Sequence, residues 1–106
     1  MKLIIAVIQD EDAVPLMQAL TAQELRATKL ASTGGFLLRG NTTLMIGVQE
    51  DEVDSVLEII RAVCRRRTKH IPQLPTEIPA SVSLPIEVEI GGAIVFVVDV
   101  ERFVRI

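Results

Sequence analysis

Cysteine is nearly absent from this chain, since Cys64 is the only one among 106 residues. No disulfide can therefore form within the chain, and in the absence of an export signal we expect a cytoplasmic protein. Long apolar runs are absent too, and none reaches the roughly 18 residues needed to cross a bilayer. The N-terminal run Leu3–Ile8 is too short for a signal sequence, and acidic residues follow it directly.

Features of metal sites, enzymes and nucleic-acid binders are missing as well. The only histidine, His70, has no cysteines or carboxylates at the spacing of zinc ligands, so we expect no metal site. No nucleophile–base pair is visible, and no paired carboxylates lie beside a pocket motif, so we expect no catalysis and no catalytic residues. The net charge of −3 argues against a nucleic-acid polymer as partner, because such binders usually present a basic face.

What remains is the pattern of a single α+β domain covering residues 1–106, 49% of them hydrophobic. Apolar and β-branched runs predict strands at 3–8, 26–31, 42–48, 86–90 and 93–100. One helix is predicted from an Asp12 cap to about Glu24, with Pro15 in its first turn, and a second from an Asp51 cap to Cys64. The order βαββαβ is that of the split βαβ, or ferredoxin-like, sandwich.

Two segments of this domain are predicted to be loops. Residues 33–41 connect the second and third strands. Residues 65–85 form a longer, irregular, proline-rich segment that begins with a basic run and contains Pro72, Pro75, Pro79 and Pro85. We interpret the basic run mainly as cations at the end of a helix, where they interact favourably with its dipole. A docking patch for an acidic partner or an anionic lipid is the alternative.

The first and last strands are apolar at every position rather than at alternate positions, as LIIAVI and IVFVV show. A strand that is buried on one face alternates, whereas a strand that is buried on both faces does not. Two helices can cover only one face of the sheet, and a chain of this length has no further layer. We therefore expect copies of the chain to cover the other face in an obligate homo-oligomer.

The stretch TGGFLLRGNTT at 33–43 has the composition of a ligand-binding segment. Its adjacent glycines leave backbone N–H groups that can approach a phosphate closely. Phe36, one of only three aromatic residues, adds a flat apolar ring, and a cation and neutral hydrogen-bonding groups follow. This combination favours a nucleotide over a peptide or a metal, although a Gly-Gly pair alone is more often a simple turn.

Four segments together resemble the PII-like signal transduction family, in its cyclic di-AMP receptor branch. They are KLIIAVIQDED at 2–12, RATKLASTGGFLLRGNTT at 26–43, IGV at 46–48 and VEIGGAIVFVVDVERF at 88–103. The resemblance implies a ferredoxin-like protomer, a homotrimer, and ligand sites in the clefts between subunits. It also implies a non-enzymatic protein that needs no cofactor, binds the second messenger cyclic di-AMP and relays this through loop rearrangement to an unknown downstream protein.

The resemblance also implies a set of ligand-binding residues: Arg26, Thr28, Gly35, Phe36, Leu37, Asn41 and Gly47. Arg26 and the amides around Gly35 suit the phosphates. Thr28 and Asn41 can hydrogen-bond an adenine edge, Phe36 can stack on a base, and Gly47 leaves room for a ring.

The chain departs from the family pattern in three places. Glu24 stands where a neutral amide near the phosphates is expected, TEIPASVSLP at 76–85 replaces a loop rich in glycine and asparagine, and the end at 104–106 lacks a glutamine-type residue. The ligand is therefore open between cyclic di-AMP and another adenine nucleotide such as ATP or ADP. A module that contacts a protein partner without any small molecule is the third reading.

Overall fold

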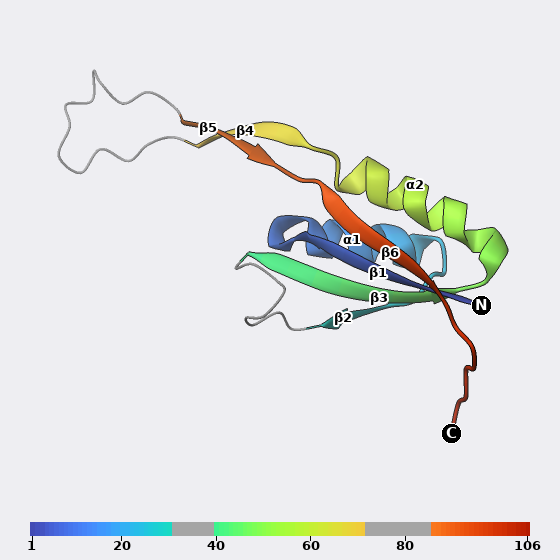
Figure 1. The fold of residues 1–106 in the computed structure, drawn as a ribbon. Coiled ribbons are helices and arrows are strands. Elements are labelled where there is room, and N and C mark those ends of the chain that lie inside the picture. The colour runs from blue at the N-terminus through green and yellow to red at the C-terminus, as the bar shows by residue number, and fades with distance from the viewer. Residues whose placement is uncertain (31–39, 72–85) are drawn as a thin grey trace, which may run out of the picture.

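The computed structural model describes residues 1–30, 40–71 and 86–106, so most of the predicted loops at 33–41 and 65–85 lies outside this range (Figure 1). The elements run in the order β1 (Lys2–Gln9), α1 (Asp10–Ala22), β2 (Ala27–Leu30), β3 (Asn41–Val48), the 3₁₀ turn η1 (Glu50–Glu52), α2 (Val53–Val63), β4 (Arg67–Ile71), β5 (Ile86–Ile90) and β6 (Ala93–Asp99).

Four of these strands form an antiparallel sheet in the order β2-β3-β1-β6. The strand β1 lies inside the sheet, between β3 and β6, with Ile5 opposite Met45 on one side and Phe96 on the other. Because β3 lies between β1 and β2, the unit β1-α1-β2 is a split βαβ. The predicted α+β class is confirmed, and the sheet order is compatible with a ferredoxin-like domain.

The core lies between this sheet and the two helices. Every second residue of β1 and β3 points towards α1 and α2, as expected for the two-residue period of a strand. The core side chains from sheet and helices are Ile4, Ala6, Ile8, Leu44, Ile46, Val48, Ala13, Leu16, Leu20, Val56, Ile60 and Cys64. Both helices therefore cover the same face of the sheet, and Cys64 is a core residue as predicted.

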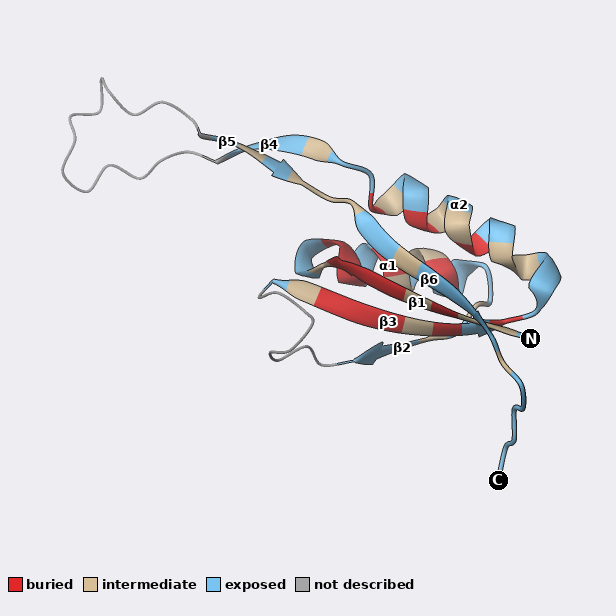
Figure 2. Ribbon diagram, in the orientation of Figure 1, coloured by how far each residue is buried: buried red, intermediate tan, exposed pale blue. Residues whose placement is uncertain are grey.

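The opposite face of the sheet, which we call the open face, has no helix over it among the described residues (Figure 2). On β6 the open face exposes Ile94, Phe96 and Val98 by 56%, 46% and 44%. Apolar residues of β1 and β3 continue this surface. The unbroken apolar sequence of the first and last strands thus corresponds to one face packed on the helices and one face uncovered.

Helix α1 begins three residues earlier than predicted, and Asp12 does not cap it. The residue before the helix is Gln9, and Pro15 is the sixth helical residue rather than the third. The prediction assumed that the Asp12 side chain accepts a hydrogen bond from a helix N–H. That carboxylate is instead buried and pairs with Arg67.

The same helix ends at Ala22, before the predicted limit, in a Schellman motif. The Leu25 N–H donates to the Leu20 carbonyl over 2.9 Å, and the Glu24 N–H donates to the Thr21 carbonyl over 2.9 Å. Glu24 occupies the left-handed position of the motif with φ +60°. Glycine is usual at this position, because a Cβ makes the left-handed conformation unfavourable.

Helix α2 follows η1, so Asp51 lies within a 3₁₀ turn and is not its cap. The Gln49 N–H, just before the turn, is instead satisfied by the Glu52 carboxylate at 2.9 Å. The apolar face of α2, which the residue spacing predicts, packs on the sheet through Val56 and Ile60.

The prediction that residues 65–85 form only a loop is wrong at its start. Residues Arg67–Ile71 form β4, which pairs antiparallel with β5, with Arg67 opposite Ile90. This two-stranded hairpin extends away from the sheet (Figure 1). The described β4 side chains are polar on both faces and mostly exposed, so the segment lacks the hydrophobic alternation that identifies a half-buried strand.

Replacing Glu24 with glycine is expected to stabilise the protein by about 1 kcal/mol, because glycine adopts the left-handed conformation without a Cβ penalty. Urea unfolding at a fixed protein concentration measures the change. The matched control is Gln23→Gly, one residue earlier at φ −97°, where glycine gains nothing and its flexibility lowers stability. Equal effects of the two substitutions would contradict the account of this helix end.

Candidate functional site

Three of the predicted ligand-binding residues lie near the β2 edge of the open face. Thr28 pairs with Met45 across β2 and β3. Continuing this register by one residue places Arg26 opposite Gly47. In β3 the residues that alternate with the buried Leu44 and Ile46 face away from the helices, so Gly47 lies on the open face.

Gly47 leaves open space at this point of the sheet. A Cβ added there would meet no atom of the described chain within 4 Å, and the residue is exposed. Packing among the described residues therefore does not require a glycine at position 47. The described part of the chain leaves the space above it empty.

Asn41 lies at the other end of β3. Six residues separate it from Gly47, which corresponds to about 20 Å along a strand. Asn41 pairs with Gln9 at the end of β1, and it lines a cavity of about 190 Å³ together with Gln9, Gly91 and Ile94. The remaining predicted residues, Gly35, Phe36 and Leu37, lie outside the described part of the chain, so their roles stay predictions.

Arg26 and Thr28 line a second cavity, of about 640 Å³, where the end of α1 meets β2. Glu24 lies in the same lining. Nevertheless, within the described ranges Arg26 has no carboxylate at salt-bridge distance, Glu24 included, and its side chain is exposed. Arg26 thus presents a cation that no described carboxylate neutralises.

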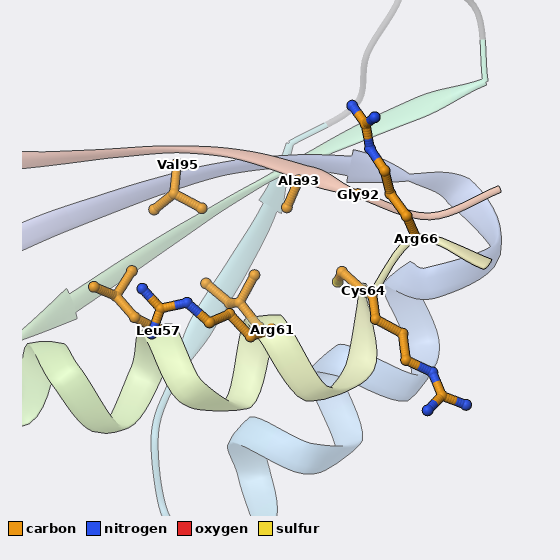
Figure 3. Close-up of a pocket in the computed structure, with 9 residues that line it drawn as sticks. Leu57, Arg61, Cys64, Arg66, Gly92, Ala93 and Val95 are labelled. Carbon is orange, nitrogen blue, oxygen red and sulfur yellow. The ribbon is translucent and has the colours of Figure 1, made fainter. Parts of the chain in front are cut away.

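A third cavity, of about 340 Å³, lies between α2 and β6 and contains none of the seven predicted residues (Figure 3). Ala93 and Val95 point from β6 towards Leu57 and Cys64 of the α2 segment, as the close-up shows. Arg66 extends past Gly92, away from the helix. The lining combines apolar side chains with the three arginines Arg61, Arg65 and Arg66, and it shares no residue with the predicted ligand-binding set.

A buried ion pair lies at the base of the hairpin. Arg67 Nη2 is 2.6 Å from Asp12 Oδ1, and the Asp12 side chain is only 2% exposed. The hydrogen bond to Asp12 raises the pKa of Arg67. Burial raises the pKa of the nearby Cys64 thiol to about 11, and the negative charge of Asp12 adds to this effect.

The sequence analysis did not single out the residues that join this base to β1 and β3. Gln9 Oε1 accepts a hydrogen bond from the Gly91 N–H at 2.8 Å, and the Thr42 hydroxyl donates to Asp10 Oδ1. Both acceptors belong to the KLIIAVIQDED segment, so the resemblance pointed to the right stretch without assigning these roles. Among the described residues no cluster of His, Cys, Asp and Glu is arranged to hold a metal ion, and no helix is long and apolar enough to span a membrane.

Comparison with known proteins assigns the chain to a family. The sequence model for the cyclic-di-AMP receptor matches residues 1–106. The chain belongs to the cyclic-di-AMP receptor family. The match confirms the family resemblance, and membership indicates a small-nucleotide ligand and a binding protein rather than an enzyme.

A solved structure is similar to the chain over nearly its whole length. It is the crystal structure of a functionally unknown protein from Pediococcus pentosaceus ATCC 25745, with 45% sequence identity and a TM-score of 0.78. The similarity covers 99% of this chain and 96% of that chain. The α+β fold is thus shared with a close sequence relative.

Because burial keeps Cys64 protonated, we expect its thiol to react with a disulfide reagent at pH 8 at least about 100-fold more slowly than an exposed cysteine. Reaction rates followed by absorbance, with and without urea, measure the difference. An exposed cysteine introduced as Thr68→Cys in a Cys64→Ala background is the control. Fast reaction of Cys64 in the folded protein would contradict its placement in the core.

Proposed function

We propose that this chain assembles as a cytoplasmic, non-enzymatic homotrimer that binds cyclic di-AMP in the clefts between subunits. Binding is passed on through loop rearrangement to a downstream protein partner. Family membership supports the class of ligand, and the geometry of the open face supports the position of the site.

The observation that carries the proposal is the composition of the open face. Its apolar positions on β1 and β6 adjoin a polar edge formed by Arg26, Thr28 and Gly47. Among the residues that the structure describes, Arg26 has no carboxylate partner and the space at Gly47 is empty. Monomeric soluble proteins rarely expose a large contiguous apolar surface. A neighbouring subunit would cover the apolar part of this face and leave its polar edge at the boundary between the two chains.

The spacing of the predicted residues also favours a site between subunits. Asn41 and Gly47 lie about 20 Å apart along β3, too far for one compact group of contacts within the described protomer. A cyclic dinucleotide has two phosphates and two adenines, and these can engage separate groups. A cleft between two copies would bring the Arg26 end of one open face and further groups of its neighbour to the same ligand.

The residue chemistry fits each part of that ligand. The Arg26 guanidinium can form charge-assisted hydrogen bonds to a phosphate, and no carboxylate of the described protomer competes for it. Thr28 can hydrogen-bond an adenine edge. A purine ring would fit over Gly47, where a side chain would occupy the space. Phe36 is assigned to base stacking, worth roughly 1–3 kcal/mol.

Calorimetry tests this assignment. Arg26→Ala and Asn41→Ala are expected to weaken cyclic di-AMP binding by about tenfold or more, or about 1.4 kcal/mol, because each loses a polar contact. Gly47→Val should also abolish tight binding while the chain stays folded, because a Cβ at this exposed position has no described atom within 4 Å. The control is Lys29→Ala, an exposed cation on β2 outside the assigned set. Wild-type affinity in all three site variants would refute the assignment.

The identity of the ligand is tested separately, by thermal shift with cyclic di-AMP, cyclic di-GMP, ATP, ADP and AMP. A ligand that binds only the folded protein must raise the melting temperature. The largest shift is expected with cyclic di-AMP. A larger shift with ATP or ADP would replace the ligand, and no shift with any of the five would favour an interaction module without a small molecule.

The proposed trimer should depend on the apolar residues of the open face. Phe96→Asp places a carboxylate in the apolar part of the open face, so we expect the particle mass to fall from three chains towards the single chain of 11.6 kDa. Light scattering coupled to size exclusion measures it at micromolar concentration. Val14→Asp is the control, since Val14 is 61% exposed on α1 at the helical side. A monomeric wild-type protein, or a Phe96→Asp variant of unchanged mass, would contradict the proposed trimer.

A further inference from the structure

We propose that the four residues Gln9–Asp12, with the sequence QDED, couple the start of β3 at the candidate site to the position of the β4–β5 hairpin. We call this segment the junction. It connects β1 to α1, and each of its four side chains contacts either β3 or the hairpin. The ligand-dependent part of the inference rests on the proposed function; the coupling itself does not.

On one side the junction holds the residues that flank Asn41. The Asp10 N–H donates to the Gly40 carbonyl over 2.8 Å, and the Thr42 hydroxyl donates to Asp10 Oδ1. Gln9 is the strand partner of Asn41 itself. Asn41 therefore lies between two residues bound to Asp10, and a displacement of Asn41 acts directly on the junction.

On the other side the junction holds the base of the hairpin. Gln9 Oε1 accepts from the Gly91 N–H at 2.8 Å. Asp12 Oδ1 pairs with Arg67 Nη2 at 2.6 Å, and Glu11 Oε2 lies 3.8 Å from Lys69 Nζ. These contacts reach both hairpin strands, since Arg67 and Lys69 belong to β4 and Gly91 follows β5.

The hairpin depends on these contacts because its own packing is slight. A two-stranded hairpin by itself is marginally stable in water. Gly91 and Gly92, at φ +92° and +88°, connect it to β6, and a Cβ on Gly91 would lie 2.1 Å from the Arg65 carbonyl oxygen. Besides the junction, the Cys64 carbonyl holds the Gly92 N–H. The orientation of the hairpin is thus fixed mainly at its base.

The Asp12–Arg67 pair favours the hairpin position seen in the structure over one in which the hairpin has moved away from α1 and the pair is broken. Asp12 Oδ2 is buried and has no hydrogen-bond partner among the described residues, so Arg67 is the main compensation for the buried charge. Removing one partner of a buried pair leaves an uncompensated charge. Asp10 and Asp12 lie in the same first turn of α1, so a shift at Asp10 and a shift at Asp12 are mechanically linked.

The coupling can be tested without ligand by hydrogen–deuterium exchange of the amides in β4 and β5. Thr42→Val removes the hydroxyl bound to Asp10, and we expect hairpin exchange to accelerate by about fivefold or more. Thr43→Val is the matched control: it is the adjacent buried threonine, and its hydroxyl has no partner among the described residues. Exchange in α2 distinguishes a local release from a general loss of stability.

A double-mutant cycle then identifies the route. In an Arg67→Met background, where the hairpin has lost its contact with Asp12, Thr42→Val should accelerate hairpin exchange further by less than about twofold, because the proposed path from Thr42 runs through Asp10 and Asp12 to Arg67. Equal effects of Thr42→Val and Thr43→Val in the wild type, or fully additive effects in the cycle, would overturn the proposed coupling.

A second experiment measures the hydrogen–deuterium exchange of the hairpin amides again, in the presence of saturating cyclic di-AMP. The wild type should change its hairpin exchange on binding, whereas Arg67→Met, which lies outside the assigned ligand-binding set, should bind with nearly unchanged affinity by calorimetry and show no change in the hairpin. Binding with an identical hairpin response in both proteins would overturn the role of the junction. Absence of binding in the wild type would refute the proposed function alone, because the ligand-free cycle still decides the coupling.

Discussion

The structure depends on one geometric constraint: two helices can cover only one face of a four-stranded sheet. The residues of β1 and β3 that point towards the helices are buried to completion or nearly so, as Ile4 and Ile46 show. The opposite face keeps an apolar composition and has no covering layer among the described residues, and Phe96 remains 46% exposed at its β6 edge. Burial of this surface would contribute about 25 cal/mol per Å² to stability, which is why we propose self-association.

The two ends of the open face differ in whether their residues already have partners within the described chain. Arg26 and Gly47 at one end are available to a group from outside the protomer. At the other end Asp10 and Gln9 are occupied with the chain's own backbone and side chains. We propose that both ends contribute to ligand binding, through Arg26 and Gly47 at one end and Asn41 at the other, and that the junction beside Asn41 relates binding to the hairpin.

The sequence predicted most of the sheet and of the helical core, because apolar periodicity reports burial directly. The predictions were wrong where the structure depends on polar contacts between distant parts of the chain or on strands exposed to solvent. The strand β4 is solvated and has no periodicity, and Asp12 resembled a helix cap although its carboxylate is used by Arg67, 55 positions away. Glu24 occupies a left-handed backbone position, where glycine is the usual residue, so the sequence did not mark this helix end. The site residues came from family resemblance, since no spacing rule brings Arg26 opposite Gly47 before the register of β2 and β3 is known.

Native mass spectrometry of the protein with cyclic di-AMP tests the central claim most directly, because one spectrum reports both assembly and occupancy. The account predicts a particle of three times the 11.6 kDa chain mass that carries up to three ligands, with little ligand on free protomers. A single chain that binds cyclic di-AMP as well as the larger particle does would contradict a site formed between subunits.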